Sequence, residues 1–154
     1  MIFCMNMLFK TRVGEGSADE FGSQSVIVSP DVRKYNSGEY GVHVIAWKQR
    51  INTALEPLIE IFIEYGAGEM LITPIDRKDT LQGSDYDLYR ETRNAVAVHL
   101  IFSRGAVSYD DMVWLFKETD CDACAVGKML FLRVCDIVRI KSCLKWKKIL
   151  MKNA

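Results

Sequence analysis

Gly66–Thr80 joins three elements in a fixed order. Gly66 ends an apolar helix, residues 70–75 form a short buried strand, and a charged loop begins at Asp76. This order is typical of the helix-to-strand joint of an α/β protein, in which functional side chains follow the carboxyl ends of parallel strands. The segment therefore predicts both an architecture and the place of any functional site.

The same order recurs along the chain. Short apolar runs predict further buried strands at residues 25–29, 97–102 and 122–126. Pro30 lacks an N–H, so we expect strand pairing to stop there, with Asp31 at the carboxyl end of the first strand. Repeated βα units predict a parallel sheet. Periodicity leaves open whether this sheet is doubly wound or part of a barrel.

An insertion and several helix ends are also readable. Asn36-Ser37-Gly38 is a turn signal, after which residues 41–47 are expected to fold back as a ribbon. Pro57 is expected at the first position of a helix whose buried face carries Leu58, Ile61, Phe62 and Tyr65. Ser84 or Asp85 is expected to cap a helix around residues 86–92, and Ser108 to open a capping box.

Composition indicates one soluble globular domain. The chain has 154 residues, 49% of them hydrophobic, and 20 basic residues balance 20 acidic ones. Five irregularly spaced cysteines favour reduced thiols. The apolar opening, residues 1–9, is too short to span a bilayer and is preceded by no basic residue, so we expect a cytoplasmic protein.

From Arg133 onward, seven basic residues stand against one acid, Asp136, among apolar residues. A helix docked on the domain is the favoured interpretation. Contact with a membrane surface or with nucleic acid is the alternative. We expect neither a membrane nor a nucleic-acid partner.

Cys121 and Cys124 form a C-x-x-C pair that enters a strand. Redox motifs need a helix N-terminus, and zinc sites need a second pair, so buried structural thiols are favoured. His43 and His99 lie in apolar strand runs, and for each a role in the core or the ribbon is expected.

Two quoted segments carry a family resemblance. Residues 21–31, FGSQSVIVSPD, and residues 66–77, GAGEMLITPIDR, resemble the cyclase subunit of imidazole glycerol phosphate synthase. Gly38-Glu39-Tyr40 and Ser108–Met112 are closest to the variant that serves surface-polysaccharide synthesis. The resemblance covers residues 17–132, between a poorly specified lead (1–16) and a basic helical tail (133–154).

The resemblance implies half of a (βα)8 TIM barrel, namely strands five to eight with a short β-ribbon insertion, since a whole barrel needs roughly 250 residues. It implies ammonia-dependent carbon–nitrogen cleavage and ring closure on a phosphorylated ribulosyl substrate, a step of histidine biosynthesis. It places a catalytic acid/base at Asp31. It implies no metal and no organic cofactor.

Substrate or phosphate contacts are implied at Thr73, Lys78, Ser103, Arg104, Gly105, Gly127 and Lys128. Lys78 and Asp79 replace the family's aspartate and glycine, and the phosphate loop at residues 103–107 keeps one glycine of a pair. A second catalytic carboxylate belongs to the half of the barrel that this chain lacks. We therefore expect impaired catalysis by the chain alone. The alternative is a non-catalytic remnant that binds a partner or is a decaying gene product.

Two kinds of partner follow. The family implies a glutamine amidotransferase subunit that supplies ammonia. Four parallel strands also leave two open edges and a concave apolar face, so we expect self-association or pairing with a separate first half-barrel.

Overall fold

The computed structural model describes residues 13–44, 49–76, 85–103, 106, 108–127, 129–130 and 136–149. The helical elements are α1 (Val13–Phe21), the 3-10 turn η1 (Ser23–Ser25), α2 (Leu55–Glu64), α3 (Tyr86–Ala95), α4 (Tyr109–Glu118) and α6 (Ile137–Trp146). The strands are β1 (Ile27–Val28), β2 (Asp31–Lys34), β3 (Tyr40–Val44), β4 (Gln49–Ala54), β5 (Glu69–Pro74), β6 (His99–Ser103) and β7 (Ala123–Ala125).

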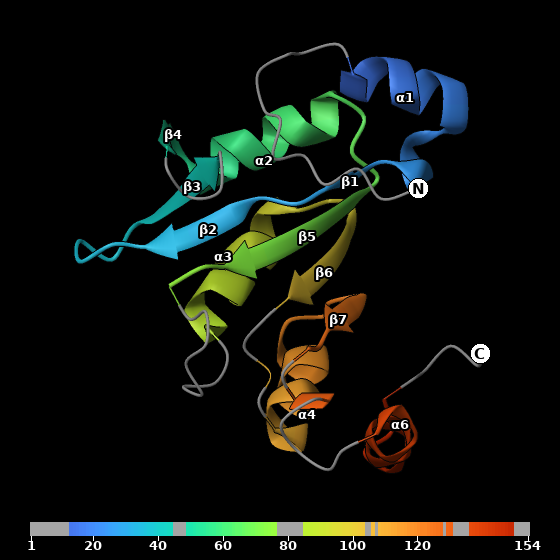
Figure 1. The fold of residues 1–154 in the computed structure, drawn as a ribbon. Coiled ribbons are helices and arrows are strands. Elements are labelled where there is room, and N and C mark those ends of the chain that lie inside the picture. Colours follow the sequence, from blue (N-terminus) through green and yellow to red (C-terminus); the bar gives the residue numbers. More distant parts are fainter. Residues whose placement is uncertain are drawn as a thin grey trace.

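One sheet organises the described residues (Figure 1). Its order is β4-β3-β2-β5-β6-β7, with β1 also paired to β5. The pairs formed by β1, β2, β5, β6 and β7 are parallel, whereas β3 and β4 are antiparallel additions. Helices follow β5 and β6 and return the chain to the next parallel strand. This α/β arrangement is that of half a TIM barrel, as the sequence predicts.

Pro30 interrupts the first strand without ending it, which corrects one expectation. β1 stops at Val28, and β2 continues from Asp31 on the same side of β5. Proline lacks an N–H but keeps its carbonyl, and the Pro30 oxygen accepts from the Thr73 amide at 3.2 Å. Asp31 therefore opens a second strand segment instead of following the last one.

The predicted ribbon is present and is larger than expected. Gly38, at a φ of 91°, closes the turn between β2 and β3, and β4 then pairs with β3. Residues 45–48 lie outside the described part of the chain. Because β3 covers the outer side of β2, the sheet is not open along the whole of that edge. Among the described strands, β1 pairs with β5 alone and β7 with β6 alone.

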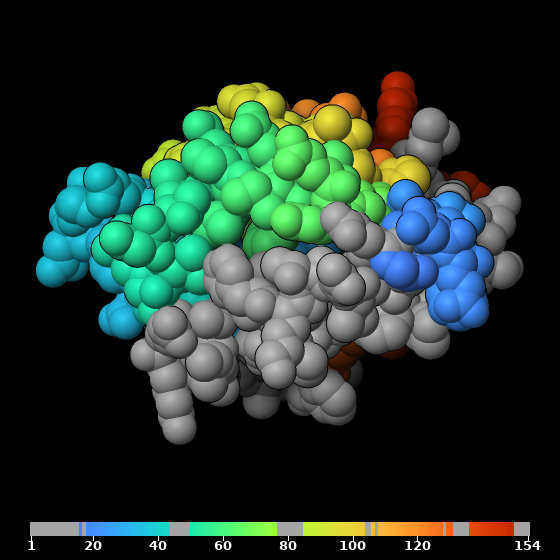
Figure 2. Space-filling model, turned by 90° about the horizontal axis from the view of Figure 1, so that it is seen from above, coloured from blue at the N-terminus to red at the C-terminus, as the bar shows by residue number. Residues whose placement is uncertain are grey.

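The core lies between the sheet and α2, α3 and α4. Met70 and Ile72 of β5, together with Leu100 and Phe102 of β6, are fully buried against these helices. The Tyr89 ring of α3 lies 3.9 Å from that of Phe102, measured between centroids. Burying a side chain of this size contributes about 1.5–3 kcal/mol. Figure 2 shows α2 across the middle of the face seen from above, with the β2–β3 turn and α1 at opposite ends.

Two details of α2 differ from the sequence prediction. The helix begins at Leu55, so Pro57 occupies its third position, where the amide still needs no helical partner. Its buried residues are Leu55, Leu58, Ile59 and Phe62, whereas Ile61 and Tyr65 are exposed. The buried face is thus rotated from the expected one.

The capping predictions are confirmed. The Asp85 carboxylate accepts from the Leu88 amide at 3.2 Å and begins α3. Ser108 and Asp111 form the reciprocal capping box of α4. Within the basic tail, residues Ile137–Trp146 form α6, whose Ile140 and Leu144 pack with Met112 of α4. No helix among the described residues is long and apolar enough to cross a membrane.

Candidate functional site

Three predicted residues lie in one row across the carboxyl ends of the parallel strands. Asp31 of β2 is in register with Thr73 of β5, and the Thr73 and Ser103 hydroxyl oxygens are 2.7 Å apart. Residues in register on neighbouring strands point to the same face. The row therefore brings a carboxylate and two hydroxyl groups together at the end of the sheet where functional residues of this architecture lie.

This row lies on the face of the sheet opposite α2, α3 and α4, which is called the open face below. Alternation places Met70 and Ile72 in the core, so Leu71 and Thr73 point the other way. Leu71 and Ile101 are in register and half-buried on this open face. In a closed barrel the same positions fill the interior. The open face thus carries apolar residues below and the polar row above.

Of the remaining predicted site residues, the structure describes Gly127 alone. Gly127 follows β7, is exposed, and has open space where a Cβ would lie. Its carbonyl accepts from the Leu130 amide at 3.0 Å. Lys78, Arg104, Gly105 and Lys128 lie outside the described residues, so their contacts remain predictions.

Sequence reasoning missed three residues that extend the row onto the ribbon. His43 of β3 is in register with Asp31 on one side and with Arg50 of β4 on the other. The Tyr35 hydroxyl oxygen lies 2.5 Å from His43 Nε2, and the Arg50 guanidinium lies 4.2 Å from the centre of the Tyr35 ring. The turn signal at residues 36–38 could have found this cluster, because a hairpin centred there pairs positions 31 and 43.

A second polar group lies on the helix-covered face. The Tyr40 hydroxyl donates to the Asp85 carboxylate at 2.8 Å, and burial raises the pKa of Tyr40 to about 12. Hydrogen bonding to Tyr40 raises the pKa of Lys34, which also pairs with Asp87 at 3.3 Å. These contacts fix the first turn of α3 against β2 and β3, and they lie away from the polar row.

The structural interpretation of the C-x-x-C pair is confirmed for Cys121, which is buried, whereas Cys124 is half-buried and lines a pocket. Burial raises the pKa of Cys121 to about 11 and that of Cys124 to about 12, so neither is a ready thiolate. His43 is buried within the ribbon, as expected. His99 is not a core residue, since it is exposed at the start of β6 opposite Glu69.

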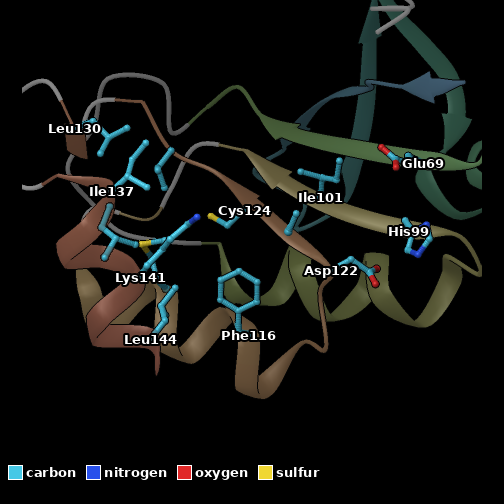
Figure 3. A pocket seen from close by; sticks show the side chains of 14 residues that line it. Glu69, His99, Ile101, Phe116, Asp122, Cys124, Leu130, Ile137, Lys141 and Leu144 are labelled. Atoms are coloured by element: carbon cyan, nitrogen blue, oxygen red, sulfur yellow. The ribbon is translucent and has the colours of Figure 1, made fainter. Parts of the chain in front are cut away.

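A pocket of about 650 Å³ lies beside β7, away from the polar row (Figure 3). Ile101 and Ala123 of the open face, Phe116 of α4, and Ile140 and Leu144 of α6 line much of it. Glu69, His99 and Asp122 lie toward one end, and none of the predicted site residues that the structure describes lines it. This pocket marks the unpaired edge of β7 rather than the expected catalytic end.

A half-barrel of parallel βα units with a polar row at the carboxyl ends of its strands defines a class of TIM-barrel-type proteins. Comparison with known sequences identifies the family within this class. The chain belongs to the histidine biosynthesis protein family, whose sequence model matches residues 6–136.

Its relatives include imidazole glycerol phosphate synthase subunit HisF of several organisms. The HisF subunit of Alkaliphilus metalliredigens is 30% identical over 136 residues, which cover 88% of this chain and 54% of that protein. That of Prochlorococcus marinus is 34% identical over 137 residues, or 86% of this chain and 53% of the relative. The chain therefore spans about half the length of the curated relatives it matches.

Proposed function

We propose that this chain supplies half of an imidazole glycerol phosphate synthase cyclase barrel, in which Asp31 acts as a catalytic acid/base. The reaction would be the ammonia-dependent cleavage and ring closure of a phosphorylated ribulosyl substrate. The observation that carries the proposal is the position of Asp31, in register with Thr73 at the carboxyl end of the parallel strands. A half-buried carboxylate there is suited to proton transfer.

The substrate phosphate is proposed to bind beyond β6 and β7. Ser103, Gly127 and the sequence around them support this, because Arg104 and Lys128 add positive charge and Gly105 lets the backbone approach an anion. Changing Arg104 or Lys128 to Ala should raise KM about tenfold with a smaller effect on kcat. Lys145→Ala, on the exposed side of α6, is the control.

The partners are proposals as well. A glutamine amidotransferase would supply ammonia, and a first half-barrel would supply the second carboxylate, since one carboxylate cannot divide acid and base roles. The family relationship and the half-length match support both.

The test is ammonia-dependent turnover, measured for the chain alone and after adding the first half of a HisF relative. We expect turnover with the added half, and a fall of about 10²–10⁴-fold in Asp31→Asn. Gly16→Ala, in α1, is the matched control. Equal turnover in Asp31→Asn would remove Asp31 from the mechanism. No turnover with either preparation would favour the non-catalytic remnant.

A further inference from the structure

We propose that Asp31 and His43 form a coupled proton-exchanging pair on the open face of the sheet, with Tyr35 as the residue that positions the imidazole. The catalytic role of the pair rests on the proposed function. The coupling between the two side chains does not rest on that function and can be tested without turnover.

The register of the hairpin brings the two groups together. Asp31 and His43 are directly opposite on antiparallel strands β2 and β3. Side chains at such positions share a face, with Cβ atoms about 4.5–5.5 Å apart. A carboxylate at this distance can accept a proton that the imidazole releases and can return it.

The surroundings of His43 show a packed arrangement. The Tyr35 ring is stacked on the imidazole, and its hydroxyl oxygen lies 2.5 Å from Nε2. Gly41 makes this packing possible, because a Cβ there would lie 2.7 Å from the Tyr35 ring. With Nε2 engaged by Tyr35, the orientation of the imidazole is fixed.

The charges around His43 oppose one another. Asp31 on β2 favours its protonation, and Arg50 on β4, also in register with it, disfavours protonation. Arg33, on the same face of β2, adds a second positive charge in register with Gly41. Tyr35 is the remaining titratable group among the described residues that face His43.

This arrangement places a second titratable group beside Asp31 within one chain. As one member accepts a proton, the other can release one, so that the pair returns to its starting charge. Two groups with different environments are what acid and base roles require. The ribbon thereby places a titratable partner beside Asp31 within this chain, in addition to the carboxylate that a first half-barrel is proposed to supply.

The experiment is an NMR titration of the whole chain, which contains two histidines, His43 and His99. Asp31→Asn and Arg50→Gln should move the pH dependence of the His43 ring signals in opposite directions, because one removes a negative neighbour and the other a positive one. Tyr35→Phe should change the tautomer of His43, read from its nitrogen shifts. His99 should stay unchanged in all three variants, and its spectrum reports whether each variant folds.

Glu69→Gln is the matched control, since Glu69 faces His99 in register as Asp31 faces His43. It should shift His99 and leave His43 unchanged. Ring signals of His43 that keep the same pH dependence in Asp31→Asn overturn the pair, whatever the turnover. Where turnover is measured, His43→Gln should remove one limb of its pH profile, and an unchanged profile also overturns the proposal. If the titration shows coupling but the chain has no turnover, the result supports the pair and counts against the proposed function.

Discussion

Two glycines two residues apart serve different physical purposes. Gly66 has a φ of 88°, the left-handed conformation that a side chain disfavours. Gly68 is close to a backbone segment, because a Cβ there would lie 2.2 Å from the Ser23 carbonyl oxygen. Backbone cannot move aside as a flexible side chain can. The joint between α2 and β5 therefore depends on conformation at one glycine and on space at the other.

We predict that Gly68→Ala lowers the free energy of unfolding by about 2 kcal/mol or more, and Gly66→Ala by about 1 kcal/mol. Urea denaturation followed by circular dichroism measures both. Gly16→Ala is the control, since Gly16 lies within α1 with no atom within 4 Å of its Cβ position, and it should be neutral or stabilising. A Gly68→Ala variant as stable as Gly16→Ala would refute the close approach.

The raised thiol pKa values predict slow alkylation of two cysteines. At pH 8 a thiol whose pKa is raised is less ionised, and the thiolate is the reactive form. Cys121 and Cys124, with pKa values of about 11 and about 12, should react with iodoacetamide at least about tenfold more slowly in the folded chain than in urea. Peptide mass spectrometry at timed intervals measures both sites. Equal rates in the folded and unfolded chain would contradict burial of the pair.

At the scale of elements, Asp85 connects a helix to the sheet. Its carboxylate caps α3 through the Leu88 amide and accepts the Tyr40 hydroxyl from β3. Asp85 and Tyr40 are both buried, so removing the carboxylate leaves the hydroxyl without this acceptor.

We predict that Asp85→Ala lowers the free energy of unfolding by about 2–3 kcal/mol, the sum of a lost cap and an orphaned hydroxyl. Asp85→Asn keeps an acceptor oxygen and should cost about 1 kcal/mol. Tyr40→Phe leaves the cap intact and should cost a similar amount. Chemical denaturation of the three variants measures these changes in the free energy of unfolding. If Asp85→Ala costs no more than Tyr40→Phe, the cap contributes nothing.

The sequence predicts elements better than it predicts how they pair. Glycine stops and apolar runs place β5 and β6 within one or two residues, and the caps place the starts of α3 and α4, because those signals are local. β4, with the sequence QRINTA, has no strong strand pattern and is defined by pairing with β3. The buried face of α2 is likewise decided by the sheet beneath it.

The residues of the candidate site also differ in how well the sequence predicts them. Asp31, Thr73 and Ser103 are predictable, since each lies near the carboxyl end of a strand expected from the sequence and the family resemblance points to them. His43 and Arg50 join them through hairpin register, which depends on the pairing of three strands. The turn signal at residues 36–38 allows the pairing of Asp31 with His43 to be inferred, but no local pattern marks Arg50.

At the scale of the whole molecule, the open face is continuous with the edge of β7 that pairs with no described strand. Leu71, Ile101 and Ala123 lie on the open face, and the last two also line the pocket beside β7. An unpaired strand edge next to a half-buried apolar surface favours pairing with another chain. A second copy or a first half-barrel would extend the sheet and cover the same surface.

We therefore predict that the purified chain self-associates at micromolar concentration, and that Leu71→Glu weakens this association at least about tenfold. Leu71 is outside the core beneath the helices, so the monomer should keep its fold while a charge opposes burial of the open face. Glu60→Lys, on the exposed side of α2, is the control and should associate as the unmodified chain does. Sedimentation velocity over a concentration series measures the equilibrium, with circular dichroism to check folding. A monodisperse monomer at these concentrations would mean that the open face is stable in water, and self-association would then be wrong. Association that persists unchanged in Leu71→Glu would place the contact elsewhere, away from the face on which Asp31 lies.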